Sequence, residues 1–214
     1  MITLYTYYRS SSSYRVRLAL NLKNLAYKIK PVHLLKDGGE QYKDEYRKMN
    51  AAGRIPLLEH IGYFVAQSMA IVEYLEENFP DKPLLPQNVV DRAYVRQLCE
   101  IVNSDIQPLQ NLSVLKKLTT DHGFSEADKQ AWCHHWISLG LESFEKLVQT
   151  KHGRFCFGDT PTAADCFLIP QVYNANRFAV DISQYPIISQ INESFLEIEE
   201  AQMAHPDVQP DTPS

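Results

Sequence analysis

A proline-rich segment divides this chain into two halves with different periodicities. The nine residues PDKPLLPQN, at positions 80–88, contain three prolines, which interrupt regular secondary structure. Before this segment, strand-like and helix-like patterns alternate in the order β-α-β-α-β-β-α, whereas after it only helical periodicity is found. We therefore expect an α/β domain over residues 1–80, a linker over 81–88 and an all-helical domain over 89–204. Residues 205–214, with three prolines and no apolar period, are expected to form a loosely ordered tail.

The pattern within each half predicts its elements. In the first half we expect a strand over 2–7, a helix from the serines at 10–13 to about Asn24, and a strand over 27–34 that lies parallel to the first. A short helix over 41–49, a hairpin over 56–65 and a helix over 67–79 follow. The second half predicts helices over 88–119, 126–150, 163–178 and 187–202.

The net charge of −5 conceals an uneven distribution. Residues 1–86 carry 12 bases and 9 acids, or +3, and residues 87–214 carry 9 bases and 17 acids, or −8. The acidic total argues against nucleic acid or an anionic membrane as the main partner. However, seven bases and no acid lie within residues 1–36, namely Arg9, Arg15, Arg17, Lys23, Lys28, Lys30 and Lys36.

The four cysteines argue against several classes of protein. They form no CxxC pair and have no metal-ligand spacing with the seven histidines, so no metal site is expected. His134 and His135 are adjacent and would point about 100° apart on a helix. All four cysteines lie beyond residue 98, which excludes a thioredoxin-type redox centre in the first half. Without a secretory signal or a long apolar run, we expect a cytoplasmic protein with reduced cysteines and no membrane partner.

A run of serines before a helix is the sharpest local feature. A helix N-terminus presents unpaired N–H groups and a partial positive charge, so hydroxyls placed there can stabilise an anion such as a thiolate. Simple capping of the helix is the alternative interpretation of Ser10–Ser13.

Four further motifs suggest structural or binding roles. Gln67-Ser68 begins a helix whose backbone can hold a carboxylate, with simple capping as the alternative. Ile55-Pro56 can adopt a cis bond that leaves the Ile55 backbone open to a peptide-like ligand. Asn103, Gln107 and Asn111 form an uncharged stripe at i, i+4 and i+8, with a kink expected at Pro108; a solvated face is the alternative. Thr162-x-x-Asp165 predicts a capping box that starts a core helix.

Together, several segments resemble the zeta-class glutathione transferases, the family that includes maleylacetoacetate isomerase. The most specific are RSSSSYRVRLAL at 9–20 and IQPLQNLS at 106–113. The segments at 36–39, 67–71 and 209–213 match in the same order, so the resemblance covers nearly the whole chain. The Gly-Asp and Thr-x-x-Asp element at 158–165 is common to glutathione transferases in general.

The resemblance implies a thioredoxin-like N-terminal domain that binds glutathione as cofactor, an all-α C-terminal domain and a homodimer. By matching position, it implies that the glutathione site includes Ser10, Ser11, Ser12, Ser13, Tyr14, Arg15, Gln41, Ile55, Pro56, Gln67, Ser68, Gln107, Asn111, Leu112 and Ser113. The expected catalytic residues are Ser10, Ser11 and Ser12. Ser12 stands where the family usually has cysteine, and Tyr14 where it often has Trp or His, so no step can use a cysteine there and we favour Ser10 and Ser11.

The implied reaction is the glutathione-dependent conversion of maleylacetoacetate to fumarylacetoacetate in tyrosine and phenylalanine catabolism. Its substrate is a small dicarboxylate, and we expect Arg9, Arg15 and Arg177 to meet its carboxylates. Arg17, about 200° from Arg15 around the helix, is expected to be structural or at an interface, and Lys23 and Lys28 to be solvated.

Three alternatives remain open. A maleylpyruvate isomerase would use the same site. A conjugating transferase or an α-haloacid dehalogenase is the second alternative, and consumption of glutathione separates conjugation from isomerisation. A non-catalytic protein of this fold would have a degraded glutathione site, yet Ser10, Ile55-Pro56 and Gln67-Ser68 are all present.

Overall fold

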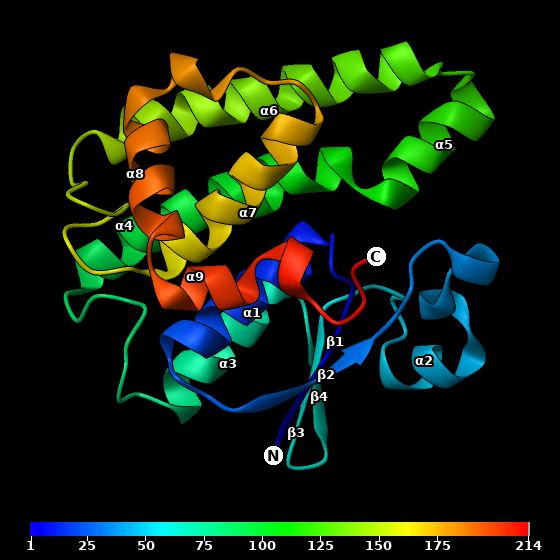
Figure 1. The fold of residues 1–214 in the computed structure, drawn as a ribbon, viewed down its shortest axis with the longest axis horizontal. Coiled ribbons are helices and arrows are strands. Elements are labelled where there is room, and N and C mark those ends of the chain that lie inside the picture. The colour runs from blue at the N-terminus through cyan, green and yellow to red at the C-terminus, as the bar shows by residue number, and fades with distance from the viewer. Residues whose placement is uncertain (214) are drawn as a thin grey trace. The chain divides into compact units, whose positions relative to one another are not determined.

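The computed structural model describes residues 1–213 and divides the chain into two compact units (Figure 1). The first unit consists of residues 1–84 together with the chain from residue 196 onward, and the second consists of residues 85–195. Within residues 1–213, no helix is long and apolar enough to cross a membrane.

The first unit contains a four-stranded mixed sheet with helices on its faces. Its elements before the linker are β1 (Ile2–Thr6), α1 (Ser11–Leu22), β2 (Tyr27–Pro31), η1 (Lys36–Gly38), η2 (Glu40–Tyr42), α2 (Asp44–Met49), β3 (Leu57–His60), β4 (Tyr63–Ala66) and α3 (Ser68–Asn78). The strand order is β2-β1-β3-β4, with β1 and β2 parallel and the other neighbours antiparallel. The predicted order of elements and the parallel pair are therefore confirmed, and the arrangement is the expected thioredoxin-like one.

Alternation along the strands separates two apolar layers. Tyr5 pairs with Leu57 across β1 and β3, and both belong to a core cluster with Tyr46 from α2. The neighbouring pair Leu4 and Leu58 is fully buried and points to the opposite face, because successive side chains of a strand alternate. Figure 1 shows α1 and α3 on that opposite side of the sheet.

The second unit is entirely helical in its regular elements. These are α4 (Val89–Glu100), the π-helical η3 (Ile101–Ile106), η4 (Gln107–Gln110), α5 (Leu112–His122), α6 (Glu126–Val148), α7 (Ala163–Arg177), η5 (Ile182–Gln184) and α8 (Pro186–Leu196), whose last residue belongs to the first unit. Thr162 and Asp165 form the predicted capping box of α7, and Asp165 also accepts a hydrogen bond from Cys156 N at 2.8 Å. Burial raises the pKa of Asp165, and its contacts identify a structural residue.

The continuous helix expected over 88–119 is interrupted. The chain passes from α4 into a π-helix and a 3₁₀ helix, and it leaves helical geometry at Asn111. Pro108 has no N–H to donate, and the wider π-turn changes the angular spacing of side chains. Asn103, Gln107 and Asn111 are therefore not held to one face by a regular 3.6-residue repeat, and Asn103 donates to Glu100 instead.

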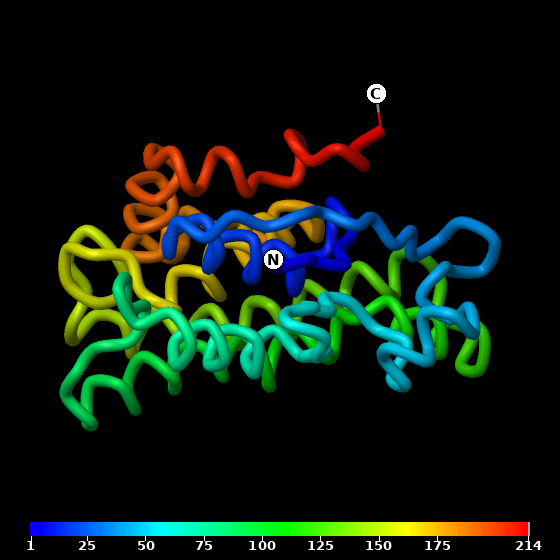
Figure 2. Tube along the Cα trace, turned by 90° about the horizontal axis from the view of Figure 1, so that it is seen from below, coloured from blue at the N-terminus to red at the C-terminus, as the bar shows by residue number. Residues whose placement is uncertain are grey.

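The C-terminal part of the chain differs most from expectation. Helix α9 (Glu199–Ala204) and η6 (Pro206–Val208) belong to the first unit rather than to the helical one. Asn21 Nδ2 donates to Glu200 O at 3.0 Å, and Arg17 Nε donates to Ala204 O at 2.9 Å. Figures 1 and 2 show this red segment running alongside the blue N-terminal part. We expected residues 205–214 to be loosely ordered, because they have no apolar periodicity. In the structure, residues 205–213 are held by side-chain hydrogen bonds, which periodicity does not predict.

Arg17 in α1 and Lys23, the C-cap of α1, also lie in the interior. Arg17 is fully buried, and its other nitrogens donate to Thr6 Oγ1 and Tyr8 O, which agrees with the expected structural role. The expectation that Lys23 is solvated is wrong. The ammonium of Lys23 lies 2.5 Å from Glu76 Oε1 and 2.8 Å from Lys82 O. Lys23 thereby joins the end of α1 to α3 and to the start of the linker. Lys28 is exposed, as expected.

Candidate active site

The turn from β1 into α1 presents the serine cluster. Ser10 N donates to Tyr7 O at 3.0 Å, and Ser10 is the N-cap of α1, with its Oγ accepting from Ser13 N at 3.2 Å. Capping uses an oxygen lone pair, so the hydroxyl proton of Ser10 remains available to an anion. The first turn of α1 contains no acidic residue, and its partial positive charge is therefore not offset from within the helix.

The next residues of α1 turn inward. Ser11 and Ser13 are buried, whereas Ser12, at the family's cysteine position, is half-buried. Ser13 Oγ has no hydrogen-bond partner among residues 1–213. Tyr14 is 1% exposed, and its ring lies edge-on to His205 with 6.1 Å between ring centres.

Arg15 connects α1 to the start of α3. The residue is 1% exposed, and its guanidinium donates through Nη1 to Ser68 Oγ at 3.1 Å. Gln67, the residue before Ser68, has φ 73° and ψ 120°, a conformation that costs a residue with a Cβ about 1–3 kcal/mol and that clusters at ligand sites. Like α1, α3 has no acidic residue in its first turn. The structure thus joins two helix N-termini that can each receive an anion.

Three more of the predicted residues lie in the loops of the same unit. Gln41 is buried; its Nε2 donates to Leu34 O at 3.3 Å, while its Oε1 has no partner within the described part of the chain. The Ile55–Pro56 peptide bond is cis. Arg9 is half-buried in the turn before Ser10, and its charge opposes the raised pKa of Tyr7, which results chiefly from burial.

The remaining predicted residues belong to the second unit. Asn111 caps α5, accepting from Ser113 N at 3.0 Å and from Ser113 Oγ at 2.8 Å, and Leu112 between them is 42% exposed. Gln107 begins η4. Arg177 ends α7 and donates to Asn174 Oδ1 at 3.0 Å.

Sequence reasoning missed the contact that the C-terminal segment makes with the serine turn. Tyr8 N donates to Asp211 Oδ2 at 2.8 Å, across 203 positions of sequence. The composition of this segment predicted a loosely ordered tail, because its residues are polar and have no periodicity. The one signal in the sequence that pointed to it was the resemblance of residues 209–213 to the family.

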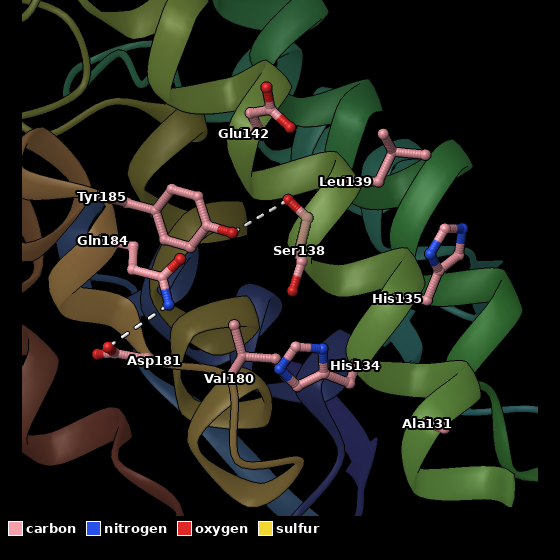
Figure 3. Close-up of a pocket in the computed structure, with 10 residues that line it drawn as sticks. All are labelled: Ala131, His134, His135, Ser138, Leu139, Glu142, Val180, Asp181, Gln184 and Tyr185. Atoms are coloured by element: carbon pink, nitrogen blue, oxygen red, sulfur yellow. Dashed lines mark hydrogen bonds between the residues drawn. The ribbon is translucent and has the colours of Figure 1, made fainter.

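A groove in the second unit contains none of the predicted site residues (Figure 3). It has a volume of about 820 Å³ and lies between α6 and the chain around η5. Tyr185 OH donates to Ser138 O at 3.2 Å and Gln184 Nε2 to Asp181 Oδ2 at 3.5 Å. His134 and His135 leave α6 in different directions (Figure 3). Within residues 1–213, no group of three His, Cys, Asp or Glu side chains is placed to hold a metal ion.

Comparison with known proteins gives consistent matches over the whole length. The model of the glutathione S-transferase N-terminal domain matches residues 4–83. A probable maleylacetoacetate isomerase 2 of Drosophila melanogaster is 48% identical, over 98% of this chain and 90% of the relative. A holo structure of a zeta-class maleylpyruvate isomerase has a TM-score of 0.95 and 42% identity, and covers 99% of this chain and 100% of its own. A maleylacetoacetate isomerase of Anaeromyxobacter dehalogenans, solved with bound glutathione, has a TM-score of 0.90 and 43% identity, with 100% and 98% coverage.

Proposed function

This chain belongs to the zeta class of glutathione transferases, and we propose that it is a glutathione-dependent cis–trans isomerase that converts maleylacetoacetate to fumarylacetoacetate. The observation that carries the proposal is the serine-capped, acid-free N-terminus of α1, joined through Arg15 and Ser68 to the similar N-terminus of α3. This is an anion-binding arrangement inside the unit that matches the glutathione transferase domain.

The donor set fits glutathione, a tripeptide with two carboxylates and a thiol. Ser68 and the backbone at the start of α3 would hold a carboxylate, and the hydroxyls at the start of α1 would meet the thiol. The unpartnered Ser13 Oγ and Gln41 Oε1, both buried, support the presence of a polar ligand, because buried polar atoms normally have a partner.

Two effects combine to hold the thiol in its ionised form. A free thiol has a pKa near 8.5, and lowering it by about two units requires about 2.7 kcal/mol. A helix N-terminus provides about 0.3–1 kcal/mol, or about 2 when partly buried. One hydrogen bond to a charged acceptor adds about 1.5–3 kcal/mol. The end of α1 and one serine hydroxyl are therefore sufficient together, and we assign the hydroxyl to Ser10, with Ser11 and Ser12 in support.

Bound glutathione supplies the nucleophile that adds reversibly to the substrate's double bond, so that the bond can rotate before the nucleophile leaves. The protein has no proton to remove from carbon in this reaction. Its residues hold the thiol ionised, and we propose that Arg9 and Arg177 orient the carboxylates of the substrate. Guanidinium groups suit this role because they pair with carboxylates in a fixed geometry. Arg15, which we also expected to meet a carboxylate, is 1% exposed and donates to Ser68 Oγ, so it supports the start of α3 instead.

The test is a coupled assay with maleylacetoacetate, glutathione and fumarylacetoacetate hydrolase. We expect fumarylacetoacetate to form at a rate that depends on glutathione. The absence of a glutathione-dependent rate would refute the isomerase function.

Maleylpyruvate is the second candidate substrate, favoured by the high structural similarity to a maleylpyruvate isomerase. The two substrates differ in the group that carries the second carboxylate, so the ratio of their kcat/KM values decides between them.

The setting of the reaction is also part of the proposal. We place the protein in the cytoplasm, as a homodimer, in tyrosine and phenylalanine catabolism. Sedimentation equilibrium tests the dimer. Neighbouring genes for homogentisate dioxygenase and fumarylacetoacetate hydrolase would support the pathway, whereas gentisate genes would contradict it.

A further inference from the structure

We propose that Asp211, near the C-terminus, is a positioning residue for the glutathione-binding turn before α1. The inference rests on the proposed function, since it takes Ser10 and Ser11 as the groups that meet the glutathione thiol. It concerns a segment that lies about 200 positions away in sequence but in the same structural unit.

The backbone of Tyr8 is held on both sides. Its N–H donates to Asp211 Oδ2 at 2.8 Å, and its C=O accepts from Arg17 Nη2 at 3.0 Å. Arg17 in turn binds the C-terminal segment, donating through Nε to Ala204 O at 2.9 Å. Both backbone polar groups of Tyr8 are thereby tied to the segment after α8.

The attachment of Tyr8 to the C-terminal segment affects the proposed site because Tyr8 lies in the turn that leads to Ser10. Tyr8 lies inside the turn closed by the hydrogen bond from Ser10 N to Tyr7 O, two residues before the N-cap of α1. A shift of its peptide would displace the hydroxyl of Ser10 and the first free N–H groups of the helix together. Small displacements of groups that meet a reacting atom have large effects on rate.

The C-terminal segment is itself anchored, so that it can hold the turn. Gln209 Nε2 donates to Met203 O at 3.0 Å and to His205 O at 2.9 Å. Thr212 Oγ1 donates to Pro206 O at 2.6 Å. These bonds fold residues 203–212 back on themselves and fix the backbone on either side of Asp211.

The second oxygen of Asp211 argues against a purely stabilising role. Oδ1 is buried and has no hydrogen-bond partner among residues 1–213. A carboxylate oxygen removed from water without a partner costs stability. The fold would lose less with a neutral acceptor, and the carboxylate is retained where it makes a strong, charge-assisted bond to the turn.

The experiment compares three variants with the wild-type enzyme by thermal unfolding, by calorimetric titration with glutathione, and by ultraviolet titration of the bound thiol. Asp211→Ala removes the acceptor, whereas Asp211→Asn keeps an oxygen that can accept from Tyr8 N. Asp207→Ala is the matched control, because Asp207 is an exposed acid of the same segment.

We expect Asp211→Ala to lose about tenfold in glutathione affinity, equivalent to about 1.4 kcal/mol, and to raise the pKa of the bound thiol. Asp211→Asn should lie between Asp211→Ala and the wild type in both measurements, and Asp207→Ala should match the wild type. A folded Asp211→Ala enzyme with wild-type affinity and thiol pKa would overturn the inference, as would an equal loss in Asp207→Ala.

A second variant covers the case in which Asp211→Ala does not fold. Thr212→Val removes the bond to Pro206 O and leaves the Asp211 carboxylate in place; it should weaken glutathione binding by a smaller factor, and wild-type affinity would refute the proposal. A wild-type protein that binds no glutathione refutes both the proposed function and the positioning role, whereas an active wild type with an unaffected Asp211→Ala variant refutes only the positioning role.

Discussion

Ser10 has two roles at the residue scale, as the N-cap of α1 and as the proposed donor to the glutathione thiolate. Ser10→Ala removes both, and we expect at least about a tenfold loss of isomerase rate, since a hydrogen bond to a charged acceptor contributes about 1.5–3 kcal/mol. It should also lose about 1 kcal/mol of unfolding free energy through the missing cap. Steady-state kinetics and chemical denaturation measure the two effects separately.

Ser10→Asp distinguishes these roles, because aspartate is a good N-cap but places a negative charge beside the thiolate. This variant should retain the stability of the wild type while the rate falls and the pKa of the bound thiol rises. A Ser10→Asp or Ser10→Ala enzyme with an unchanged rate would show that another serine, such as Ser11, is the donor.

At the scale of elements, a buried ion pair joins α1, α3 and the linker. Glu76 Oε1 accepts from Lys23 Nζ at 2.5 Å and from Leu84 N at 2.9 Å. The side chain of Glu76 is 6% exposed and that of Lys23 is 0% exposed. We expect Lys23→Met to cost about 3–5 kcal/mol of unfolding free energy, because it leaves a buried carboxylate without its cation.

The double variant Lys23→Met, Glu76→Gln restores a neutral site whose amide oxygen can still accept from Leu84 N. Urea denaturation of the single and double variants tests the pair: the double variant should recover much of the lost stability. If Lys23→Met alone unfolds at the wild-type urea concentration, the pair contributes nothing and our account of the linker attachment is wrong.

Elements with a strong local period were predictable, and contacts made across the sequence were not. The strands of the first unit and helices α6 and α7 follow directly from alternation, helical periodicity and the Thr162–Asp165 capping box. The π-helix at Ile101–Ile106 has no such signal. The burial of Lys23 and the docking of residues 205–213 depend on partners more than 50 positions away, which periodicity does not encode.

The candidate site was predictable to a similar extent. The serine run, Gln67-Ser68 and Ile55-Pro56 indicated ligand-binding positions by themselves, and the family resemblance supplied Gln41. The bond from Arg15 to Ser68 and the bond from Tyr8 to Asp211 required the tertiary structure.

For the molecule as a whole, the burial of the cysteines predicts that none of them reacts as a nucleophile in place of the glutathione thiol. All four cysteines are buried, and burial raises the pKa of Cys133 to about 11. At pH 8 a thiol-specific reagent should therefore label essentially none of them in the folded protein and all four after denaturation. Rapid labelling of the native protein would contradict this.

The same shift contributes to the loss of stability at alkaline pH. A pKa that is higher in the folded than in the unfolded protein gives a contribution that is complete below the ordinary value and lost as pH rises from about 9 to about 11. The free energy of unfolding should fall across that range, and it should fall less steeply in a folded Cys133→Ser variant.

The central claim is that glutathione acts catalytically and is returned after each turnover. The most direct test supplies maleylacetoacetate in large molar excess over glutathione and measures fumarylacetoacetate and free glutathione when the reaction ends. The account predicts complete conversion of the substrate with all of the glutathione recovered. A yield limited to the amount of glutathione added, with a matching loss of free thiol, would contradict it and identify a conjugating transferase.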